Sequence, residues 1–191
     1  GSVVQVYLEP EVLARNLPRY LSESVRATLQ SVGVQLKPNR NVVKVSLEKR
    51  PRPNGDQLED KVIVTLDNGE ELVTDFVLTA TGIFPNTELA ENAGLEIDPV
   101  NGGIVTNAEL EARQNVFVAG DVLSYYDVVL GRRRYEHYEH ATATGRHAGL
   151  NMSSSSNMKP FRHVSMFWSD IGKDISFQAV GEIKSELDTY S

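Results

Sequence analysis

Residues 116–121 read VFVAGD, four apolar residues followed by a glycine and an aspartate. A run of this kind is typical of a buried strand that ends at the carboxyl edge of a sheet, where open α/β folds bind their ligands. Gly120 lets a flat or phosphorylated ligand approach the main chain, and the Asp121 carboxylate can accept hydrogen bonds from sugar-alcohol hydroxyls. Taken alone, the stretch is explained equally well as a strand that ends in a common turn pair.

The first part of the chain predicts a strand, a helix and a second strand. Residues 3–8 form a short apolar strand. Asn16 is the expected N-cap of the helix, and Pro18 lies in its first turn, where proline is tolerated. Gly33 is expected to end the helix before a short strand at residues 34–36. Units of this order build parallel sheets.

The hydrophobic period changes in the next segment. Apolar and polar residues alternate at residues 43–48 and again at 62–66, which predicts two half-buried strands. A proline-rich stretch at residues 51–60 is expected to be a surface loop between them. The Asp-Asn-Gly turn at residues 67–69 leads into a third strand at 71–81, whose centre is almost wholly apolar. We therefore predict a three-stranded antiparallel meander that closes back into the parallel sheet.

The second half of the chain completes the fold class. Short strands are expected at residues 103–106 and 116–119, and a helix is expected from about residue 136 to residue 150. The serine run at residues 153–156 is read as a loop, and aromatic and β-branched residues from position 160 onward predict further strands. The predicted class is α/β: Rossmann-type parallel sheets with an antiparallel meander, followed by the start of an α+β domain.

The composition narrows the kinds of function. The chain has 191 residues, of which 40% are hydrophobic and 24% charged, as in ordinary soluble domains. No apolar run approaches the roughly 20 residues of a membrane span, and no secretory signal is expected within the chain. The absence of cysteine excludes disulfides and redox-active thiol pairs, so an oxidoreductase must move electrons through a bound cofactor. A net charge of -7 argues against nucleic-acid binding as the main function, and no metal site is expected.

Several stretches are similar to a known family. The sequence ATGIFPN at residues 80–86, followed by Thr106 and then by the Gly-Asp pair, resembles the two-dinucleotide-domain flavoprotein reductases. The sequences GRRRYEHYEHA at residues 131–141 and FWSD at 167–170 are similar to the apoptosis-inducing factors within that superfamily. The FWSD segment also resembles the bacterial ferredoxin reductases. No GxGxxG phosphate-binding fingerprint occurs, so the resemblance covers nearly the whole chain but only part of such a protein.

The resemblance implies three parts and an activity. Residues 1–84 correspond to the second half of an NAD-binding domain, 85–158 to the returning segment of an FAD-binding domain, and 159–191 to the start of a C-terminal, dimerisation-like domain. The implied protein oxidises NADH through FAD, pairs into a homodimer on reduction and acts in programmed cell death. Its implied location is the mitochondrial intermembrane space, with relocation to the nucleus. The alternatives are a ferredoxin or rubredoxin reductase and a non-catalytic module that binds nucleic acid or partners.

The resemblance also implies the residues of the site. The cofactor-binding positions are Glu9, Gly82, Asn86, Gly120, Asp121, Glu136, His137, Phe167 and Trp168. Of these, Glu9 would accept from the adenosine ribose hydroxyls and favour NADH over NADPH, unless it is an ordinary exposed acid. A helix that begins near Glu136 would turn its positive end toward the reduced flavin, and His137 would set the local protonation. The alternative makes Glu136 a first-turn acid and His137 a surface histidine.

Two further stretches each leave two interpretations open. His137 and Trp168 are the implied catalytic residues, because the indole would pack against the flavin or the nicotinamide. The tryptophan is otherwise a residue of an interdomain core. The basic triplet at residues 132–134 is either a solvated turn or a patch that contacts DNA by charge, as the resemblance implies.

Overall fold

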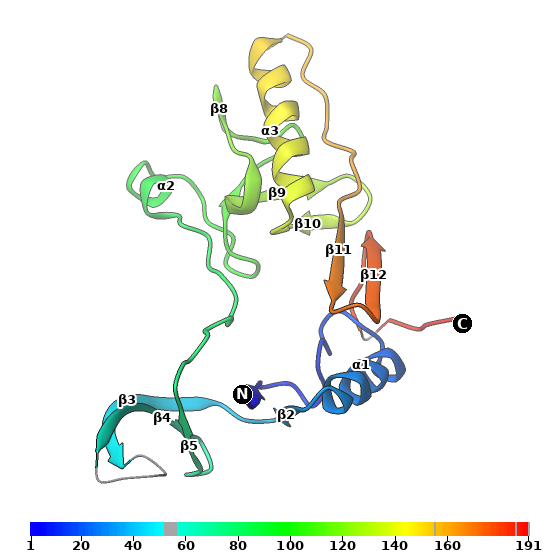
Figure 1. The fold of residues 1–191 in the computed structure, drawn as a ribbon. Coiled ribbons are helices and arrows are strands. Elements are labelled where there is room, and N and C mark those ends of the chain that lie inside the picture. The colour runs from blue at the N-terminus through cyan, green and yellow to red at the C-terminus, as the bar shows by residue number, and fades with distance from the viewer. Residues whose placement is uncertain (52–56, 155, 186, 191) are drawn as a thin grey trace. The chain divides into compact units, whose positions relative to one another are not determined.

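The computed structural model describes residues 1–51, 57–154, 156–185 and 187–190 (Figure 1). The chain divides into two compact units. Unit 1 contains Gly1–Thr81 and Ile183–Ser191, and unit 2 contains Gly82–Glu182. Parallel and antiparallel strand pairs occur together with helices, which confirms the predicted α/β class. No helix in the described ranges is both long and apolar enough to span a bilayer.

Unit 1 begins with the predicted strand–helix–strand. Its elements are β1 (Val3–Val6), α1 (Arg19–Ser31), β2 (Val34–Lys37), β3 (Val42–Pro51), β4 (Leu58–Leu66) and β5 (Glu71–Thr74). Strands β1 and β2 are parallel, with Val3 opposite Val34. The N-cap of α1 is Pro18 and not the predicted Asn16, because the backbone N–H of Asn16 donates to the carbonyl of Leu13 in a separate turn. The helix therefore begins after this turn.

The antiparallel meander is also confirmed. Its strand order is β3-β4-β5, and the buried side chains of Ile63, Val64 and Leu66 lie on the central strand. The third strand is shorter than predicted, because β5 ends at Thr74. Phe76 in the expected continuation is 89% exposed, since no described strand pairs with that segment. The predicted loop is shorter as well: β3 and β4 enter it from both sides, and residues 52–56 lie outside the described residues.

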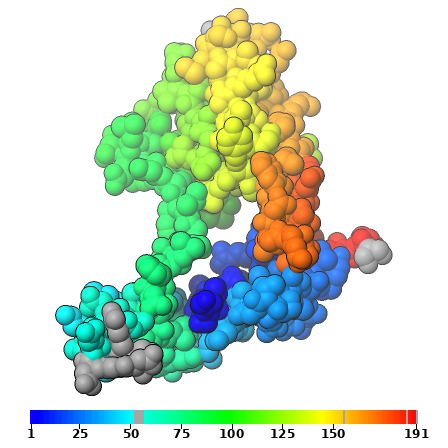
Figure 2. All heavy atoms as spheres, viewed as in Figure 1, coloured from blue at the N-terminus to red at the C-terminus, as the bar shows by residue number. Residues whose placement is uncertain are grey.

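Unit 2 is built around one long helix. Its elements are α2 (Glu88–Asn92), β6 (Ile104–Val105), β7 (Glu111–Arg113), β8 (Val116–Phe117), η1 (Gly120–Val122), β9 (Leu123–Asp127), β10 (Gly131–Arg133), α3 (Tyr138–Ser153), β11 (Met166–Ile171) and β12 (Ile175–Val180). The N-terminal end of α3 lies beside β10 and the start of β11 (Figure 1). In the space-filling view, α3 (yellow) lies at the surface of the unit with one face toward the viewer (Figure 2).

The central strand of unit 2 differs from the predicted one. Strand β8 has only two residues and pairs antiparallel with β7, and Val116 is partly exposed. The chain then turns through η1, where Gly120 has a φ of +78°, and continues as β9 between β6 and β10. Leu123 and Tyr125 of β9 are buried in the core together with Phe161 and Leu110. The predicted strand at residues 116–119 is therefore confirmed only at Val116–Phe117, and Val118, which follows it, is buried in the core at 7% exposure.

A buried carboxylate fixes the loop that precedes β6. Asp98 is 5% exposed and accepts hydrogen bonds from the backbone N–H groups of Val100 and Asn101 at 2.9 and 3.1 Å. It also accepts from the Asn101 amide at 2.9 Å and from the Ser124 hydroxyl of β9 at 2.7 Å. Burial acts to raise the pKa of Asp98, but these hydrogen bonds outweigh it and hold the pKa well below its ordinary range.

Candidate functional site

The predicted Gly-Asp pair lies against the first turns of α3. The backbone N–H of Gly120 donates to the Thr144 hydroxyl at 3.0 Å, and a Cβ added at Gly120 would lie 3.9 Å from that of Ala141. Among the described residues, no side chain caps the N-terminus of α3, where His137 is the N-cap. Main-chain N–H groups at a helix N-terminus favour negative charge on a neighbouring group.

The side chain of Asp121 is available to a ligand. Its backbone carbonyl accepts from the Arg134 guanidinium at 3.0 Å, which fixes the main chain. In the part of the chain that the structure describes, its carboxylate makes no hydrogen bond or ion pair. A carboxylate with free lone pairs beside an uncapped helix end fits a ligand that presents both hydroxyl donors and an electron-rich group.

The guanidinium groups of the basic triplet are bound within unit 2. Arg132 donates to the carbonyls of Thr106 and Ser124 at 2.7 and 2.8 Å. Arg133 forms an ion pair with Glu182 at 2.6 Å and donates to the Tyr135 hydroxyl at 3.1 Å. All three arginines are half-buried. The interpretation of this triplet as a solvated turn was therefore wrong.

Arg134 brings three segments of the chain together. It donates to the carbonyl of Asn101 at 2.7 Å, to the carbonyl of Asp121 at 3.0 Å and to the Glu136 carboxylate at 2.6 Å. Glu136 precedes α3, and the acid in the first helical turn is Glu139, so the interpretation of Glu136 as a first-turn acid was wrong. The Arg134 guanidinium instead holds the Glu136 side chain.

His137 is held between two aromatic rings. Its imidazole stacks on Phe167 of β11 with ring centroids 4.9 Å apart, and on Tyr135 at 5.6 Å. Burial lowers the pKa of His137, and the negative charges of Glu136, Asp121 and Glu139 oppose this effect. His137 is half-buried, so the alternative of a surface histidine was wrong.

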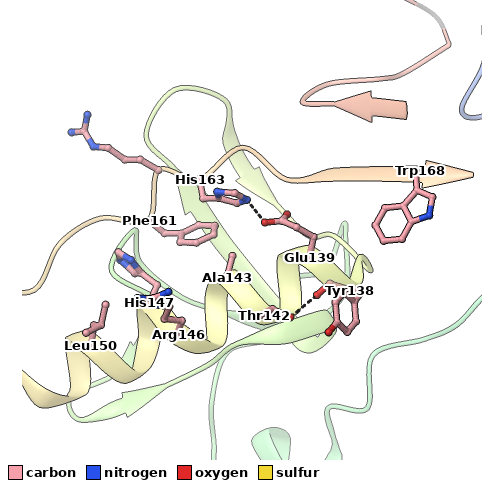
Figure 3. A pocket seen from close by; sticks show the side chains of 11 residues that line it. Tyr138, Glu139, Thr142, Ala143, Arg146, His147, Leu150, Phe161, His163 and Trp168 are labelled. Atoms are coloured by element: carbon pink, nitrogen blue, oxygen red, sulfur yellow. Dashed lines mark hydrogen bonds and ion pairs between the residues drawn. The ribbon is translucent and has the colours of Figure 1, made fainter. Parts of the chain in front are cut away.

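Trp168 lies on the other side of β11 from Phe167, because consecutive residues of a strand point to opposite faces. The indole is 56% exposed. It lines a surface groove of about 530 Å³ that follows α3. Tyr138 and Trp168 lie at one end of this groove, and His147 and Leu150 lie toward the other (Figure 3).

The remaining predicted residues do not join this group. Glu9 belongs to unit 1, where its carboxylate forms an ion pair with Arg15 at 2.6 Å. Gly82 has a φ of +91°, which favours glycine, and Asn86 is exposed. In the described ranges, no group of three or more His, Asp or Glu side chains could hold a metal ion.

The sequence patterns did not indicate the buried polar residues of this region. Thr144 is fully buried and receives the Gly120 hydrogen bond, while His140 is fully buried and lies 2.7 Å from the Ser165 hydroxyl. Their place on the buried face of α3 follows from the helical spacing of residues 140, 144 and 148. Nothing in the local sequence points to Ser165 as the partner.

Comparison with known proteins confirms the resemblance. The chain is 44% identical over 188 residues to apoptosis-inducing factor 1, mitochondrial, of Dictyostelium discoideum, covering 98% of the chain and 34% of that relative. It is 40% identical over 189 residues to the putative apoptosis-inducing factor 1, mitochondrial, of Drosophila melanogaster, covering 99% of the chain and 24% of that relative. The chain thus spans about a third and a quarter of the lengths of these relatives.

Family models and a solved structure agree with this result. Residues 148–191 match the model of the mitochondrion-associated apoptosis-inducing factor C-terminus. The fold is similar to that of a ferredoxin reductase from Rhodopseudomonas palustris, with a TM-score of 0.78 and 27% identity, covering 94% of this chain and 41% of that one. Residues 1–145 match the remaining model. The chain belongs to the pyridine nucleotide-disulphide oxidoreductase family.

Proposed function

We propose that the whole protein of which this chain is a part is an FAD-dependent NADH oxidoreductase of the apoptosis-inducing factor type. The observation that carries the proposal is the free Asp121 carboxylate beside the uncapped N-terminus of α3. When bound, FAD accepts a hydride from NADH, which is chemistry that the cofactor supplies and the protein positions. The match of residues 148–191 to the C-terminal model favours this type over other members of the family.

The proposal gives each residue of the site a role. Asp121 accepts hydrogen bonds from the ribitol hydroxyls, and Gly120 allows the ligand to approach the main chain. The first N–H groups of α3 stabilise negative charge on the reduced ring. His137 sets the protonation state of its surroundings, with Glu136 held beside it by Arg134. Phe167 holds the imidazole in a fixed plane through the 4.9 Å stack.

The proposal also assigns the parts of the chain. Residues 1–84 form the second half of the NAD-binding domain, 85–158 form the returning segment of the FAD-binding domain, and 159–191 begin the C-terminal domain. Gly82 and Asn86 then lie in the hinge that joins the two nucleotide domains. Support comes from the change of compact unit between Thr81 and Gly82 and from the positive φ of Gly82.

An absorption spectrum of the whole protein tests the activity. Flavin bands that bleach when NADH is added under anaerobic conditions are the expected result. A protein purified without flavin, and unable to take up added FAD, would contradict the proposal and favour a non-catalytic binding module.

Replacement of Trp168 and replacement of His137 are expected to change different properties of the reduction by NADH. We place the Trp168 indole against the nicotinamide, so Trp168→Ala should shorten about tenfold the lifetime of the long-wavelength absorption that forms after reduction by NADH. The lost stacking is on the order of 1 kcal/mol. His137→Ala should leave that lifetime and change the pH dependence of the reduction rate, because it removes a titratable group. Stopped-flow spectra measure both quantities, and two variants that behave as wild type would show that the region is structural.

Glu9 is expected to select NADH, and its ion pair with Arg15 sharpens the test. Glu9→Ser removes the acid that repels the 2′-phosphate of NADPH and leaves the Arg15 guanidinium without its partner. The ratio of kcat/KM for NADPH to that for NADH should rise roughly tenfold, a change of about 1.4 kcal/mol. In the double variant Glu9→Ser/Arg15→Ala the rise should be smaller. An unchanged ratio in Glu9→Ser would identify Glu9 as an ordinary surface acid.

A second candidate is an electron-transfer reductase, which the fold similarity to the R. palustris ferredoxin reductase favours. Reduction of an added ferredoxin or rubredoxin by NADH at a rate well above that of oxygen would support it. We also propose a homodimer that forms on reduction. A role in cell death and a mitochondrial location are proposed because the names of the relatives state them for those proteins. Within the mitochondrion we propose the intermembrane space as the location of the protein, with relocation to the nucleus.

We also propose that the whole protein contacts DNA by charge. The guanidinium groups of residues 132–134 already donate to acceptors in unit 2. A contact by charge therefore has to use other basic residues. A salt-dependent affinity of the whole protein for duplex DNA, unchanged in Arg132→Gln, is the expected result.

A further inference from the structure

A buried hydrogen bond joins α3 to the segment that enters β11. The Nδ1 atom of His140 lies 2.7 Å from the Ser165 hydroxyl. His140 is fully buried and Ser165 is 5% exposed, so water does not compete for this bond. The Ser165 carbonyl also accepts from the backbone N–H of Gly181 at 3.3 Å, at the end of β12. One residue therefore ties the β11–β12 hairpin to the helix.

The hydrogen bond between His140 and Ser165 lies next to the stack of His137 on Phe167. His137 is the N-cap of α3 and His140 lies in its first turn, close enough for the charge of His137 to act on the imidazole of His140. Ser165 precedes Phe167 by two residues, so both point to the same side of the extended chain. Helix and strand thus meet at two neighbouring contacts, His140 with Ser165 and His137 with Phe167.

The surroundings of His140 keep its imidazole in place. Its ring contacts the rings of Tyr125, Tyr135 and Phe161, with centroids 5.5, 5.4 and 5.9 Å away. Burial lowers the pKa of His140 to about 4, helped by the neighbouring histidines at positions 137 and 163 and opposed by Glu139. The imidazole therefore stays neutral near pH 7, and the hydrogen bond to Ser165 does not switch with physiological changes of pH.

The register of β11 decides which aromatic residue meets His137. A shift of this strand by one residue would exchange its two faces. Trp168 would then face His137, and Phe167 would face the groove. Hydrophobic packing distinguishes these two aromatic residues poorly, whereas a single hydrogen bond at Ser165 distinguishes the two registers.

We propose that His140 and Ser165 are positioning residues that fix the register of β11 against α3, and thereby place Phe167 against His137 and Trp168 in the groove. This inference rests on the proposed function, since it concerns where the nicotinamide meets the flavin site. Both residues are buried, so each acts through its neighbours.

The test compares Ser165→Ala with Ser165→Thr, which keeps the hydroxyl, and with Ser169→Ala, a matched change on the same strand. In the flavin-loaded whole protein, hydrogen–deuterium exchange of residues 166–171 should be at least tenfold faster in Ser165→Ala. The lifetime of the long-wavelength absorption after NADH reduction should fall about tenfold in the same variant. Ser165→Thr should restore both quantities, and Ser169→Ala should change neither. Flavin content should stay at the wild-type level throughout.

Two outcomes would overturn the inference. Faster hydrogen exchange in Ser165→Ala with an unchanged lifetime of the long-wavelength absorption would show that the hydrogen bond has only a structural role. Unchanged hydrogen exchange in Ser165→Ala would show that the hydrogen bond does not fix β11. Failure of the proposed function is distinguishable from both, because the wild-type protein would then lack flavin bands. His140→Phe, which keeps a planar aromatic ring without a ring nitrogen, should behave like Ser165→Ala.

Discussion

Asp121→Ala is expected to yield a whole protein that purifies with little FAD. The variant removes the carboxylate that is free to accept hydroxyl donors beside the uncapped end of α3. Charge-assisted hydrogen bonds contribute about 1.5–3 kcal/mol each, so two of them correspond to at least a hundredfold in Kd. The ratio of flavin to protein absorbance in the purified variant measures the effect.

Two controls accompany this variant. Asp121→Asn keeps one acceptor oxygen and should retain an intermediate amount of flavin. Asp174→Ala removes an exposed acid of unit 2 in the turn between β11 and β12, and should retain all of it. Full flavin content in Asp121→Ala, with normal folding, would disprove the assignment of Asp121 to the ribitol.

The second large effect is expected for stability. Asp98→Ala leaves the Ser124 hydroxyl, the Asn101 amide and two backbone N–H groups without their acceptor. Because unpaired buried polar groups each cost about 1–3 kcal/mol, the local free energy of unfolding should fall by about 3 kcal/mol or more. Hydrogen exchange of the amides of β6 and β9 in the whole protein measures this change. Unaltered exchange would show that water replaces the carboxylate without cost.

The same residue predicts a pH dependence. The folded pKa of Asp98 lies below its unfolded value of about 3.9, so its contribution to stability is present above that pH. The contribution is lost as the pH falls below this value toward the folded pKa, because the unfolded state then binds the proton first. Asp98→Asn does not titrate and should lack this part of the acid destabilisation. A wild-type acid profile in that variant would contradict the prediction.

Local patterns were sufficient where partners are close in sequence. The parallel pair β1–β2 and the meander β3–β4–β5 follow from periodicity and turn residues alone. Strand β9 was not predicted, because its second residue, Ser124, is polar and yet buried, through a hydrogen bond to Asp98, which lies 26 residues earlier. The strand predicted beyond Thr74 was apolar, but a strand also requires a paired neighbour.

The sequence motifs named several residues that the structure places close together, but they did not indicate the contacts that hold these residues in place. The residues beside the N-terminus of α3 were chosen from motifs, and the structure brings Asp121, His137 and Phe167 together. The contacts that hold them were not predictable, because they join distant segments: Gly120 to Thr144 and His140 to Ser165. Such partners depend on the folded arrangement and leave no mark on the local sequence.

The hydrogen bonds of Arg134 to earlier segments affect the order in which unit 2 folds during synthesis. Its single guanidinium binds the main chain at Asn101 and at Asp121, both of which leave the ribosome earlier. Until residue 134 has emerged, these two segments lack their shared donor, and the Gly-Asp turn is not yet fixed. We therefore expect the edge of unit 2 that carries Asp121 to remain open in shorter nascent chains and to close only once the arginine is outside the exit tunnel.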